Sequence, residues 1–321
     1  MALLAVENLR VTYGAVEAVR NVSFHLDRGQ ILGIVGESGS GKSTLGYAIA
    51  KLLRPPGQIV GGHVWFDGVD LVPLSELELK PIRWRELAVV MQSGMNALNP
   101  VAPIRRQFED AILTHRPMGA KAMRERVREM LALVNIEERY ADHYPHELSG
   151  GMKQRVAIAL ALVLEPKLII FDEPTTALDV VVQRYIVQNL KALRERYHFS
   201  ALFISHDLGT VLEIADRVAV MYAGRLVEVQ DARSLLQHPQ HPYTQALLSC
   251  FPDPRADHIE VMGIPGSPPD LADVRPGCPF APRCAQIIDR CWRETPAYLA
   301  SPDGNGVACH MVKEREGSAY V

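Results

Sequence analysis

Residues 36–44 read GESGSGKST and match the phosphate-binding pattern G-x-x-x-x-G-K-[ST] at every fixed position. The glycines of this stretch can adopt backbone conformations closed to other residues, so successive N–H groups can turn inward around an anion. We expect Lys42 to reach the outer phosphates of a triphosphate and the Ser43 hydroxyl to ligate Mg²⁺. The stretch therefore predicts a phosphate loop.

The residues on either side support this interpretation. Residues 31–35 are an apolar run that predicts a buried strand leading into the loop, and residues 44–53 predict a helix that Pro55 and Pro56 end. The N-terminus of that helix would face the phosphates. The alternative is a surface loop that matches the pattern by chance, and the flanking strand and helix argue against it.

Composition limits the classes of function. The 321 residues include 34 Lys and Arg against 37 Asp and Glu, so the net charge of -3 provides no general field for binding nucleic acid. The first ten residues lack a basic segment followed by an apolar run, and no segment approaches the roughly 20 apolar residues that cross a bilayer. We expect a soluble, cytoplasmic protein.

Several further segments read as strands and helices. Residues 6–13 and 19–26 alternate apolar and polar side chains as half-buried antiparallel strands do, and Asp67-Gly68 marks a hairpin turn. Residues 104–134 predict a helical insert, and residues 218–229, broken at Ala223-Gly224, predict an edge hairpin. Two short apolar runs, 168–171 and 201–204, predict buried strands of one sheet.

Residues 148–155 read LSGGMKQR and precede an apolar helix. Ser149 is a favourable N-cap, and with Gly150 and Gly151 it forms a second helix N-terminus with exposed N–H groups, where another phosphate can bind. Capping chemistry alone favours an ordinary capped helix.

Carboxylates and a histidine follow the two apolar runs. Asp172 and Glu173 end the first run, and Ser205-His206-Asp207 ends the second. Phosphoryl transfer to water needs a metal ligand and a group that orients or deprotonates the water, which we assign to Asp172 and Glu173. We assign His206 to the γ-phosphate, with a buried structural histidine as the alternative.

Seven motifs together resemble an ABC-transporter ATPase subunit over residues 1 to about 232. They are, in chain order, Tyr13, residues 36–44, Gln92, LSGGMKQR, LIIFDEP at 168–174, Ala177-Leu178-Asp179 and His206. The resemblance implies an α/β fold, with a P-loop NTPase core, an antiparallel β flank and a helical subdomain at about 93–160. It also implies that two ATPase subunits pack head to tail, so that the LSGG residues of one cap the ATP on the other's phosphate loop.

The same resemblance implies individual roles. Tyr13 would stack on adenine, Gln92 would sense Mg²⁺ and the membrane partner, Glu173 would be the catalytic base, and Asp179 would lie at the dimer interface. With Ser43, Gln92 and Asp172 at the magnesium, the expected ATP-binding set is Tyr13, Gly36, Ser38, Gly39, Ser40, Gly41, Lys42, Ser43, Thr44, Gln92, Ser149, Gly150, Gly151, Asp172 and Asp179.

A second resemblance narrows the family. QHPQHPYTQALL at 237–248, GCPFAPRC at 277–284 and MQSGMNALNP at 91–100 resemble segments of oligopeptide and dipeptide importer ATPases, closer to the D-type subunit than to the F-type. This implies a peptide importer motor on the cytoplasmic face of the membrane, with an F-type ATPase subunit, two permeases and, indirectly, a substrate-binding protein. Nickel, opine or oligosaccharide import is an alternative. A soluble ABC ATPase is another, against which the single compact cassette argues.

The extension at 233–321 is rich in proline and contains all five cysteines. Cys278, Cys284, Cys291 and Cys309 are separated by five, six and seventeen residues, in a segment with too little apolar content for its own core. A zinc ion, a [4Fe-4S] cluster and free or disulfide-linked cysteines are open on spacing alone. Family resemblance favours [4Fe-4S].

Two further expectations concern this extension. Cys250 is predicted to be a buried apolar filler. Residues 252–276 are expected to form a strap tied by the cluster. Because the phosphate loop is hundreds of residues upstream in an independent core, the cluster is expected to serve folding or docking and to leave nucleotide binding unaffected.

Overall fold

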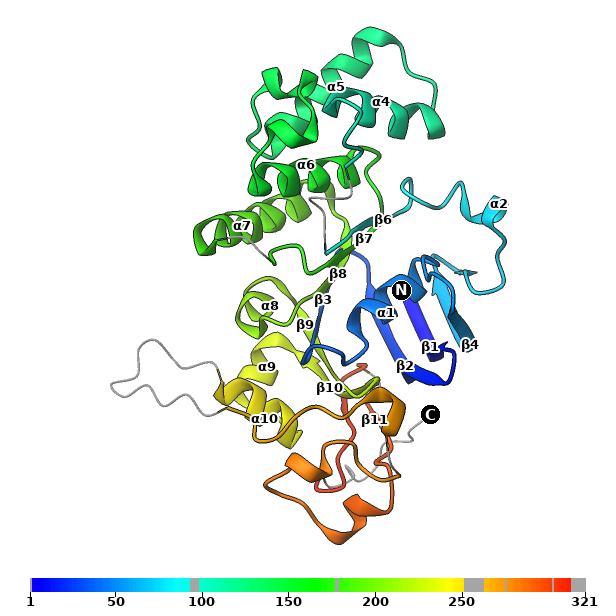
Figure 1. The fold of residues 1–321 in the computed structure, drawn as a ribbon, viewed down its shortest axis with the longest axis vertical. Coiled ribbons are helices and arrows are strands. Elements are labelled where there is room, and N and C mark those ends of the chain that lie inside the picture. Colours follow the sequence, from blue (N-terminus) through cyan, green and yellow to red (C-terminus); the bar gives the residue numbers. More distant parts are fainter. Residues whose placement is uncertain are drawn as a thin grey trace. The chain divides into compact units, whose positions relative to one another are not determined.

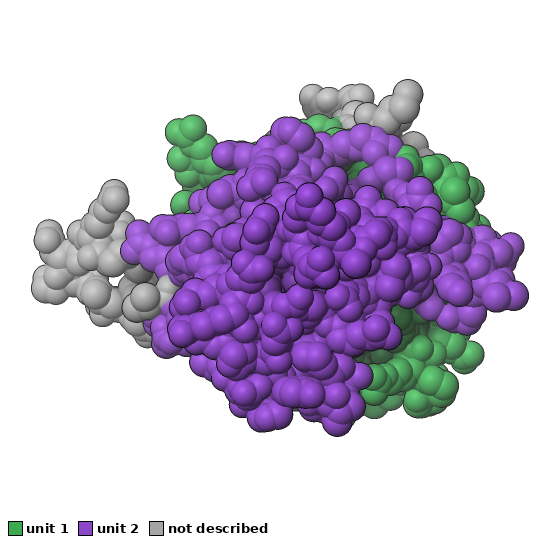
Figure 2. Space-filling view, turned by 90° about the horizontal axis from the view of Figure 1, so that it is seen from above, with its two compact units in different colours: residues 1–27, 31–72, 204–321 green, residues 28–30, 73–203 purple. Residues whose placement is uncertain are grey.

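The computed structural model describes residues 2–92, 98–176, 179–250, 263–274, 276–301 and 303–312, and Figure 1 shows the order of its helices and strands. The chain divides into two units, coloured separately in Figure 2. Unit 1 comprises residues 1–27, 31–72 and 204–321, and unit 2 comprises residues 28–30 and 73–203.

Unit 1 contains a four-stranded antiparallel sheet in the order β2-β1-β4-β5. The strands are β1 (Ala2–Tyr13), β2 (Val16–Asp27), β4 (Gly57–Phe66) and β5 (Val69–Asp70). Asp67 and Gly68 both have positive φ in the turn that joins β4 to β5. The predicted antiparallel flank and its hairpin turn are confirmed.

A second set of strands in unit 1 begins at β3 (Ile31–Val35), which is buried at all five residues. β3 pairs in parallel with β9 (Arg217–Tyr222), and β9 pairs with β10 (Arg225–Asp231) as the predicted hairpin. The hairpin is not at an edge, however. β12 (Gly306–Val307) pairs with β10, and β11 (Leu299–Ala300) pairs with β12, so the extension continues the sheet.

The helices of unit 1 are α1 (Lys42–Ile49), α8 (Leu208–Ile214), α9 (Ala232–Gln237) and α10 (Pro242–Ser249). α8 lies directly on β3, because a Cβ added at Gly33 would be 2.1 Å from Val211 Cγ1. Glycine therefore allows the close approach of this helix to the strand.

Unit 2 contains β6 (Leu87–Val90) and β7 (Leu168–Asp172), which pair in parallel, and β8 (Ser200–Ile204), which is in unit 2 up to Phe203. Its helices outside the helical insert are α2 (Glu76–Leu79) and α7 (Val180–Tyr197). The predicted buried strands at 168–171 and 201–204 are confirmed.

The predicted helical insert is also present in unit 2. It consists of α4 (Ile104–His115), α5 (Ala120–Leu133), α6 (Gly150–Leu162) and the short 3₁₀ helices η1 (Glu138–Asp142) and η2 (Pro145–Glu147). α4, α5, η1 and α6 share one apolar core. On α5, the charged face is exposed, while Met123, Val127 and Met130, spaced at helical intervals, are buried in that core.

The fully buried carboxylate of Glu228 on β10 anchors the start of the extension. It accepts backbone N–H groups from Gln240 at 2.7 Å and His241 at 2.9 Å, and the side-chain amide of Gln230. These bonds fix the segment before α10 against the sheet, because a buried carboxylate is stable only when its oxygens are hydrogen-bonded.

An aromatic cluster then joins the extension to β9. Tyr222, Tyr243 and Phe280 are each at most 2% exposed, and their ring centroids are 4.6 to 5.4 Å apart. The 3₁₀ helices η3 (Leu271–Asp273), η4 (Ala281–Arg283) and η5 (Asp289–Trp292) complete the extension. Its described residues are therefore packed as part of unit 1, while the division of the chain at residue 232 stays a prediction.

Two predictions about the extension have different outcomes. Cys250 is only half-buried at the end of α10, where its Sγ donates to the Ala246 carbonyl, so the prediction of a buried filler is wrong. Of the expected strap, residues 252–262 and 275 lie outside the described residues. Among the described residues, no helix has the length and apolar composition needed to cross a membrane.

Candidate nucleotide-binding site

The phosphate loop in unit 1 connects β3 to α1. Gly36 and Gly41 have φ values of 152° and 98°, and a Cβ added at Gly36 would be 2.2 Å from the Met221 carbonyl oxygen. Both the backbone conformation and the available space therefore require glycine. The predicted strand, loop and helix are confirmed in this order, but α1 begins at Lys42 and ends at Ile49, so Pro55 and Pro56 are not what ends it.

Lys42 is the first residue of α1 and is 6% exposed. Its Nζ donates to the carbonyl oxygens of Gly36 at 2.8 Å and Glu37 at 2.9 Å. The ammonium group thus lies across the loop, next to the N-terminus of α1. A cation and a helix N-terminus together provide an electrostatic environment suited to phosphate.

Two neighbouring segments brace the loop by backbone contacts. The N–H of Gly224, in the β9–β10 turn, donates to the Ser40 carbonyl at 3.0 Å, and the N–H of Arg20 donates to the Gly224 carbonyl at 2.8 Å. A Cβ added at Gly41 would be 2.3 Å from the Ala18 carbonyl, so β2 passes close beneath the loop.

His206 lies in unit 1, in the turn between β8 and α8, and its side chain is exposed. The Ser205 N–H next to it donates to the Ile34 carbonyl at 3.1 Å, which places the turn beside the end of β3. The alternative of a buried structural histidine is therefore wrong. Tyr13 is the half-buried last residue of β1, and its ring lies against Gly57.

Unit 2 contains the carboxylates. β6 and β7 are parallel, so Gln92, two residues beyond β6, and Asp172, the last residue of β7, lie at the same edge of the sheet. Asp172 is 1% exposed and Glu173 is 6% exposed, whereas Gln92 is exposed. This arrangement agrees with the expectation that carboxylates gather at the carboxyl ends of parallel strands.

Glu173 has a backbone conformation that the sequence did not reveal. Its φ is 50°, in the left-handed region, which is strained for a residue with a Cβ and is common at functional sites. The hydroxyl of Thr176 donates to Glu173 Oε2 at 2.8 Å and so helps to fix the direction of the carboxylate. Sequence reasoning missed this contact of Thr176 with Glu173.

The LSGG serine and the aspartate predicted at the dimer interface also lie in unit 2, each at the start of a helix. Ser149 is the exposed N-cap of α6 and accepts the Met152 N–H at 3.3 Å, as predicted. Asp179 is the exposed N-cap of α7 and accepts the Val182 N–H at 2.9 Å. A Cβ added at Gly151 would be 3.0 Å from Val182, so the two helix starts are in contact.

The structure thus groups the predicted residues in two sets. Unit 1 contains Tyr13, His206 and the loop residues Gly36, Ser38, Gly39, Ser40, Gly41, Lys42, Ser43 and Thr44. Unit 2 contains Gln92, Ser149, Gly150, Gly151, Asp172, Glu173 and Asp179. Ala177 and Leu178 lie outside the described residues, as do residues 93–97 of the Gln92 motif.

Sequence reasoning missed a contact between the extension and the phosphate loop. Arg283 pairs with the Glu37 carboxylate through Nη1–Oε2 at 2.6 Å and Nη2–Oε1 at 3.0 Å, and the Glu37 N–H donates to the Tyr243 hydroxyl at 3.0 Å. No sequence signal pairs residues 246 positions apart. The expectation that the loop belongs to a core independent of the extension is therefore wrong.

The four clustered cysteines line one cavity of about 10 Å³. The Cys278 N–H donates to the Cys291 carbonyl at 2.8 Å, which joins two of the cysteine segments. Three sulfurs also accept a backbone N–H from the residue two positions later: Phe280 for Cys278, Gln286 for Cys284 and Met311 for Cys309.

Burial raises the pKa of the Cys278 thiol to about 11. The hydrogen bond from the Phe280 N–H lowers this pKa, and repulsion by the neighbouring cysteines raises it further. Burial likewise raises the pKa of Cys284 and of Cys309. Within the described ranges, no group of three or more His, Cys, Asp or Glu side chains is placed to hold a metal ion.

Two protein-family models match this chain. The family model described as "ABC transporter" matches residues 19–176, and the model described as "Oligopeptide/dipeptide transporter, C-terminal region" matches residues 227–291. The second match covers the segment from β10 through the first three clustered cysteines.

Whole-chain relatives extend the match. The chain is 42% identical to the dipeptide transport ATP-binding protein DppD of Bacillus subtilis, over 99% of this chain and 97% of the relative. It is 44% identical to the oligopeptide transport ATP-binding protein OppD of the same organism, over 94% and 86%.

The fold comparison gives the same result. The dimeric post-hydrolysis structure of the ATP-binding cassette MJ0796 with ADP and Pi matches with a TM-score of 0.65 and 32% identity, over 72% of this chain and 99% of that chain. The chain is an ATPase with the fold of the ABC cassette. It belongs to the ABC transporter family, among the ATP-binding subunits that carry the oligopeptide/dipeptide transporter C-terminal region.

Proposed function

We propose that the protein is the ATP-hydrolysing motor subunit of a peptide importer. The observation that carries this proposal is the similarity to dipeptide and oligopeptide transport ATP-binding proteins over nearly the whole chain, including the C-terminal region. We assign residues 1–232 to the ATPase domain and residues 233–321 to the extension.

The residues fit ATP and Mg²⁺ by their chemistry. In unit 1, the loop N–H groups, Lys42 and the N-terminus of α1 suit the phosphates, and the Ser43 hydroxyl is an oxygen ligand suited to Mg²⁺. In unit 2, we assign the buried Asp172 carboxylate to the same ion. When bound, Mg²⁺ neutralises charge that develops on the phosphates. Glu173, oriented by Thr176, accepts a proton from the attacking water. His206 donates to the γ-phosphate.

The exposed start of α6 is the part of the proposed site that acts on a second ATPase subunit. Ser149, Gly150 and Gly151 present N–H groups at a helix N-terminus that is accessible to a partner. We assign this surface to the ATP on the partner's phosphate loop, with Asp179 beside it and Gln92 toward the membrane subunits. The motor then works as an ATPase pair with an F-type subunit on two permeases, at the cytoplasmic face of the membrane.

Reconstitution tests this function. The full chain, with an F-type ATPase subunit and two permeases in vesicles, should import a labelled di- or oligopeptide when ATP and a peptide-loaded binding protein are supplied. The isolated chain should be mostly monomeric and slow. Full activity of the isolated chain, independent of substrate, would contradict the motor assignment in favour of a soluble ABC ATPase. ATP-driven import of nickel but not of peptides would correct the proposed substrate and leave the motor assignment in place.

We further propose that Cys278, Cys284, Cys291 and Cys309 hold a [4Fe-4S] cluster. Support comes from the four cysteines that line one cavity and from the backbone N–H groups directed at three of the sulfurs, which stabilise bound thiolates. In the described residues these side chains are not already placed to hold a metal ion. A cavity of about 10 Å³ holds about one water, so the cysteine segments must adjust to accept the cluster. The cluster would cross-link segments that lack a core of their own.

Metal analysis after anaerobic purification tests the cluster. We expect about four iron and four acid-labile sulfide per chain, with the visible absorbance of an iron–sulfur protein. One zinc per chain, without iron or sulfide, would replace the cluster with a four-cysteine zinc site.

A further inference from the structure

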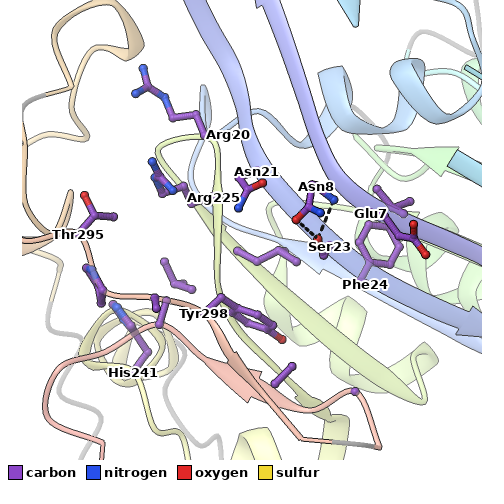
Figure 3. Close-up of a pocket in the computed structure, with 18 of the residues that line it drawn as sticks. Glu7, Asn8, Arg20, Asn21, Ser23, Phe24, Arg225, His241, Thr295 and Tyr298 are labelled. Atoms are coloured by element: carbon purple, nitrogen blue, oxygen red, sulfur yellow. Dashed lines mark hydrogen bonds between the residues drawn. The ribbon is translucent and has the colours of Figure 1, made fainter. Parts of the chain in front are cut away.

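A cavity of about 670 Å³ lies within unit 1, between the antiparallel sheet and the extension (Figure 3). Its walls come from β1, β2 and β10 on one side and from residues 278–280, 295–298, 300–301, 304 and 308 of the extension on the other. None of residues 36–44 lines it, so it is separate from the phosphate loop. Its volume lies in the range of about 300–1,000 Å³ that is typical of small-molecule sites.

Two arginines come together at this cavity. Arg20 on β2 and Arg225 on β10 lie on the same side of it with Asn21, across from Tyr298 and His241 (Figure 3). Burial and then the charge of Arg20 lower the pKa of Arg225, while the charge of Glu17 acts in the opposite direction. The lowered pKa therefore reflects burial of the guanidinium first and the nearby positive charge of Arg20 second.

The two guanidinium groups differ in their hydrogen bonds. Arg20 donates to the backbone carbonyls of Glu17 at 3.0 Å and Leu271 at 2.8 Å, which fix its position. Within the part of the chain that the structure describes, the Arg225 guanidinium has no hydrogen-bond acceptor. The Glu17 carboxylate pairs instead with Arg10 at 2.7 Å. No Arg225 nitrogen is among the buried, unpartnered polar atoms of the described residues, so the guanidinium stays accessible to a ligand in the cavity.

Two asparagines that line the cavity provide neutral hydrogen-bond donors, Asn21 beside the arginines and Asn8 beside Ser23 (Figure 3). Asn8 and Asn21 line the cavity from adjacent strands, and both have positive φ, at 49° and 54°. The β1–β2 register is irregular at Asn8, where such bulges turn side chains out of the normal alternation. Ser23 Oγ accepts the Asn8 N–H at 2.8 Å and donates to Asn8 Oδ1, so the Asn8 side-chain amide keeps its N–H groups for a ligand.

The balance of charge at the cavity favours an anion. Glu7 is the acidic side chain among the described lining residues, and it accepts the Trp65 Nε1–H at 3.2 Å. Burial lowers the pKa of His241 to about 4, so this lining residue is neutral near pH 7. The apolar part of the lining includes Val6, Phe24, Leu226, Pro279, Phe280 and Pro296.

We propose that this cavity binds a small organic phosphate, with Arg20 and Arg225 on the phosphate group and the apolar walls around the rest of the molecule. Two guanidinium groups match the charge of about -1.5 to -2 that a phosphomonoester carries at pH 7. Each planar guanidinium can also donate two parallel hydrogen bonds to phosphate oxygens. A carboxylate would neutralise only one of the two charges. The proposal does not depend on which substrate the transporter carries.

Binding to the full-length chain tests this proposal, with a saturating non-hydrolysable ATP analogue and Mg²⁺ present so that the phosphate loop is filled. The probes are phenyl phosphate, benzoate and inorganic phosphate, titrated by calorimetry or ligand-observed NMR. We expect saturable binding of phenyl phosphate and weaker binding of the other two probes. Phenyl phosphate should also slow hydrogen exchange in residues 295–301.

The matched variants are Arg225→Gln and Arg233→Gln, which remove one charge each. Arg233 is exposed on α9 and does not line the cavity. Arg225→Gln should weaken phenyl phosphate binding by roughly 10- to 100-fold, as expected for a lost charge-assisted contact, while Arg233→Gln should not change it. Arg225→Lys, which keeps the charge but loses the fork, should fall between wild type and Arg225→Gln.

Three results would overturn the proposal: equal phenyl phosphate binding by wild type and Arg225→Gln, no binding once the ATP analogue fills the loop, or equally tight binding of benzoate. Melting temperature and ATP-analogue affinity, measured without phenyl phosphate, show whether the variants are folded. The hydrogen-exchange result on the unmodified chain gives an independent answer if Arg225→Gln is unstable.

Discussion

The guanidinium of Arg283 forms a bidentate salt bridge with the carboxylate of Glu37, the second residue of the phosphate loop. The Arg283 side chain is 5% exposed and that of Glu37 is 24% exposed. Arg283 directly precedes Cys284, and the Tyr243 hydroxyl accepts the Glu37 N–H. The extension therefore contacts both the backbone and the side chain of a residue that borders the triphosphate site.

Arg283→Ala should weaken ATP binding. The substitution leaves the Glu37 carboxylate without its cation beside the site of an anionic ligand, and breaking a buried pair typically costs about 3–5 kcal/mol of stability, less here because Glu37 is partly exposed. Titration with a fluorescent ATP analogue measures the affinity. Arg290→Ala is the matched control, because Arg290 is 62% exposed and pairs with Glu294 within the extension.

Glu37→Gln in the Arg283→Ala background distinguishes repulsion from misfolding. If the freed carboxylate repels the phosphates, the double variant should recover part of the lost affinity. Equal affinity in wild type and Arg283→Ala would show that the pair does not affect the loop.

Glu173→Gln should bind ATP and hydrolyse it roughly 10² to 10⁴ times more slowly, which is the typical loss for a general base. The amide keeps the shape of the side chain and the contact with Thr176, so the strained backbone at φ 50° should persist. Turnover is measured in the assembled complex. Lys42→Ala is the contrasting variant, because it should weaken nucleotide binding itself; near-normal turnover by Glu173→Gln would refute its role.

The parts of the fold that sequence predicted are those with a local pattern. The strands 31–35 and 168–172 are unbroken apolar runs, and Ser149 caps its helix by contacts within four residues. Such features depend on neighbours in the chain, so a single sequence contains the information needed to place them.

The parts that sequence missed depend on distant residues. The pairing of β12 with β10 makes an expected edge hairpin internal, and the Arg283 pair joins segments 246 residues apart. The left-handed backbone conformation of Glu173 could not be predicted from residue type, because glutamate rarely adopts that conformation. Tertiary packing, not local preference, determines all three.

Acidification should destabilise the extension through His241. Burial lowers its pKa to about 4, against a weaker opposing effect of a hydrogen bond to the Ala308 backbone. Since the unfolded chain takes up this proton near pH 6.5 and the folded chain only near pH 4, stability is lost as the pH falls between these values, by up to about 3 kcal/mol. Melting curves between pH 7 and pH 4.5 measure the effect.

His241→Asn is the matched variant for that measurement. Asparagine preserves a hydrogen-bond acceptor at the N-cap of α10, where His241 Nδ1 now accepts the Tyr243 N–H at 3.0 Å, and it does not titrate. We expect a lower melting temperature at pH 7, because a buried ring is lost, but a flatter dependence on pH. An unchanged slope would assign the acid sensitivity to other groups.

Cys284→Ser should remove the iron and the visible absorbance of the extension and make its proline-rich part sensitive to proteases. The position of Arg283 changes the expected effect on nucleotide binding: a loosened cysteine segment should also release Glu37, so ATP-analogue affinity should fall as in Arg283→Ala. Cys250→Ser is the control, because Cys250 is outside the cluster cavity and contacts the Ala246 carbonyl. Cys284→Ser could instead lose the metal while its nucleotide affinity matches that of Cys250→Ser. That result would show that the aromatic cluster of Tyr222, Tyr243 and Phe280 is enough to keep Arg283 on the loop. The metal would then stabilise only the outer part of the extension.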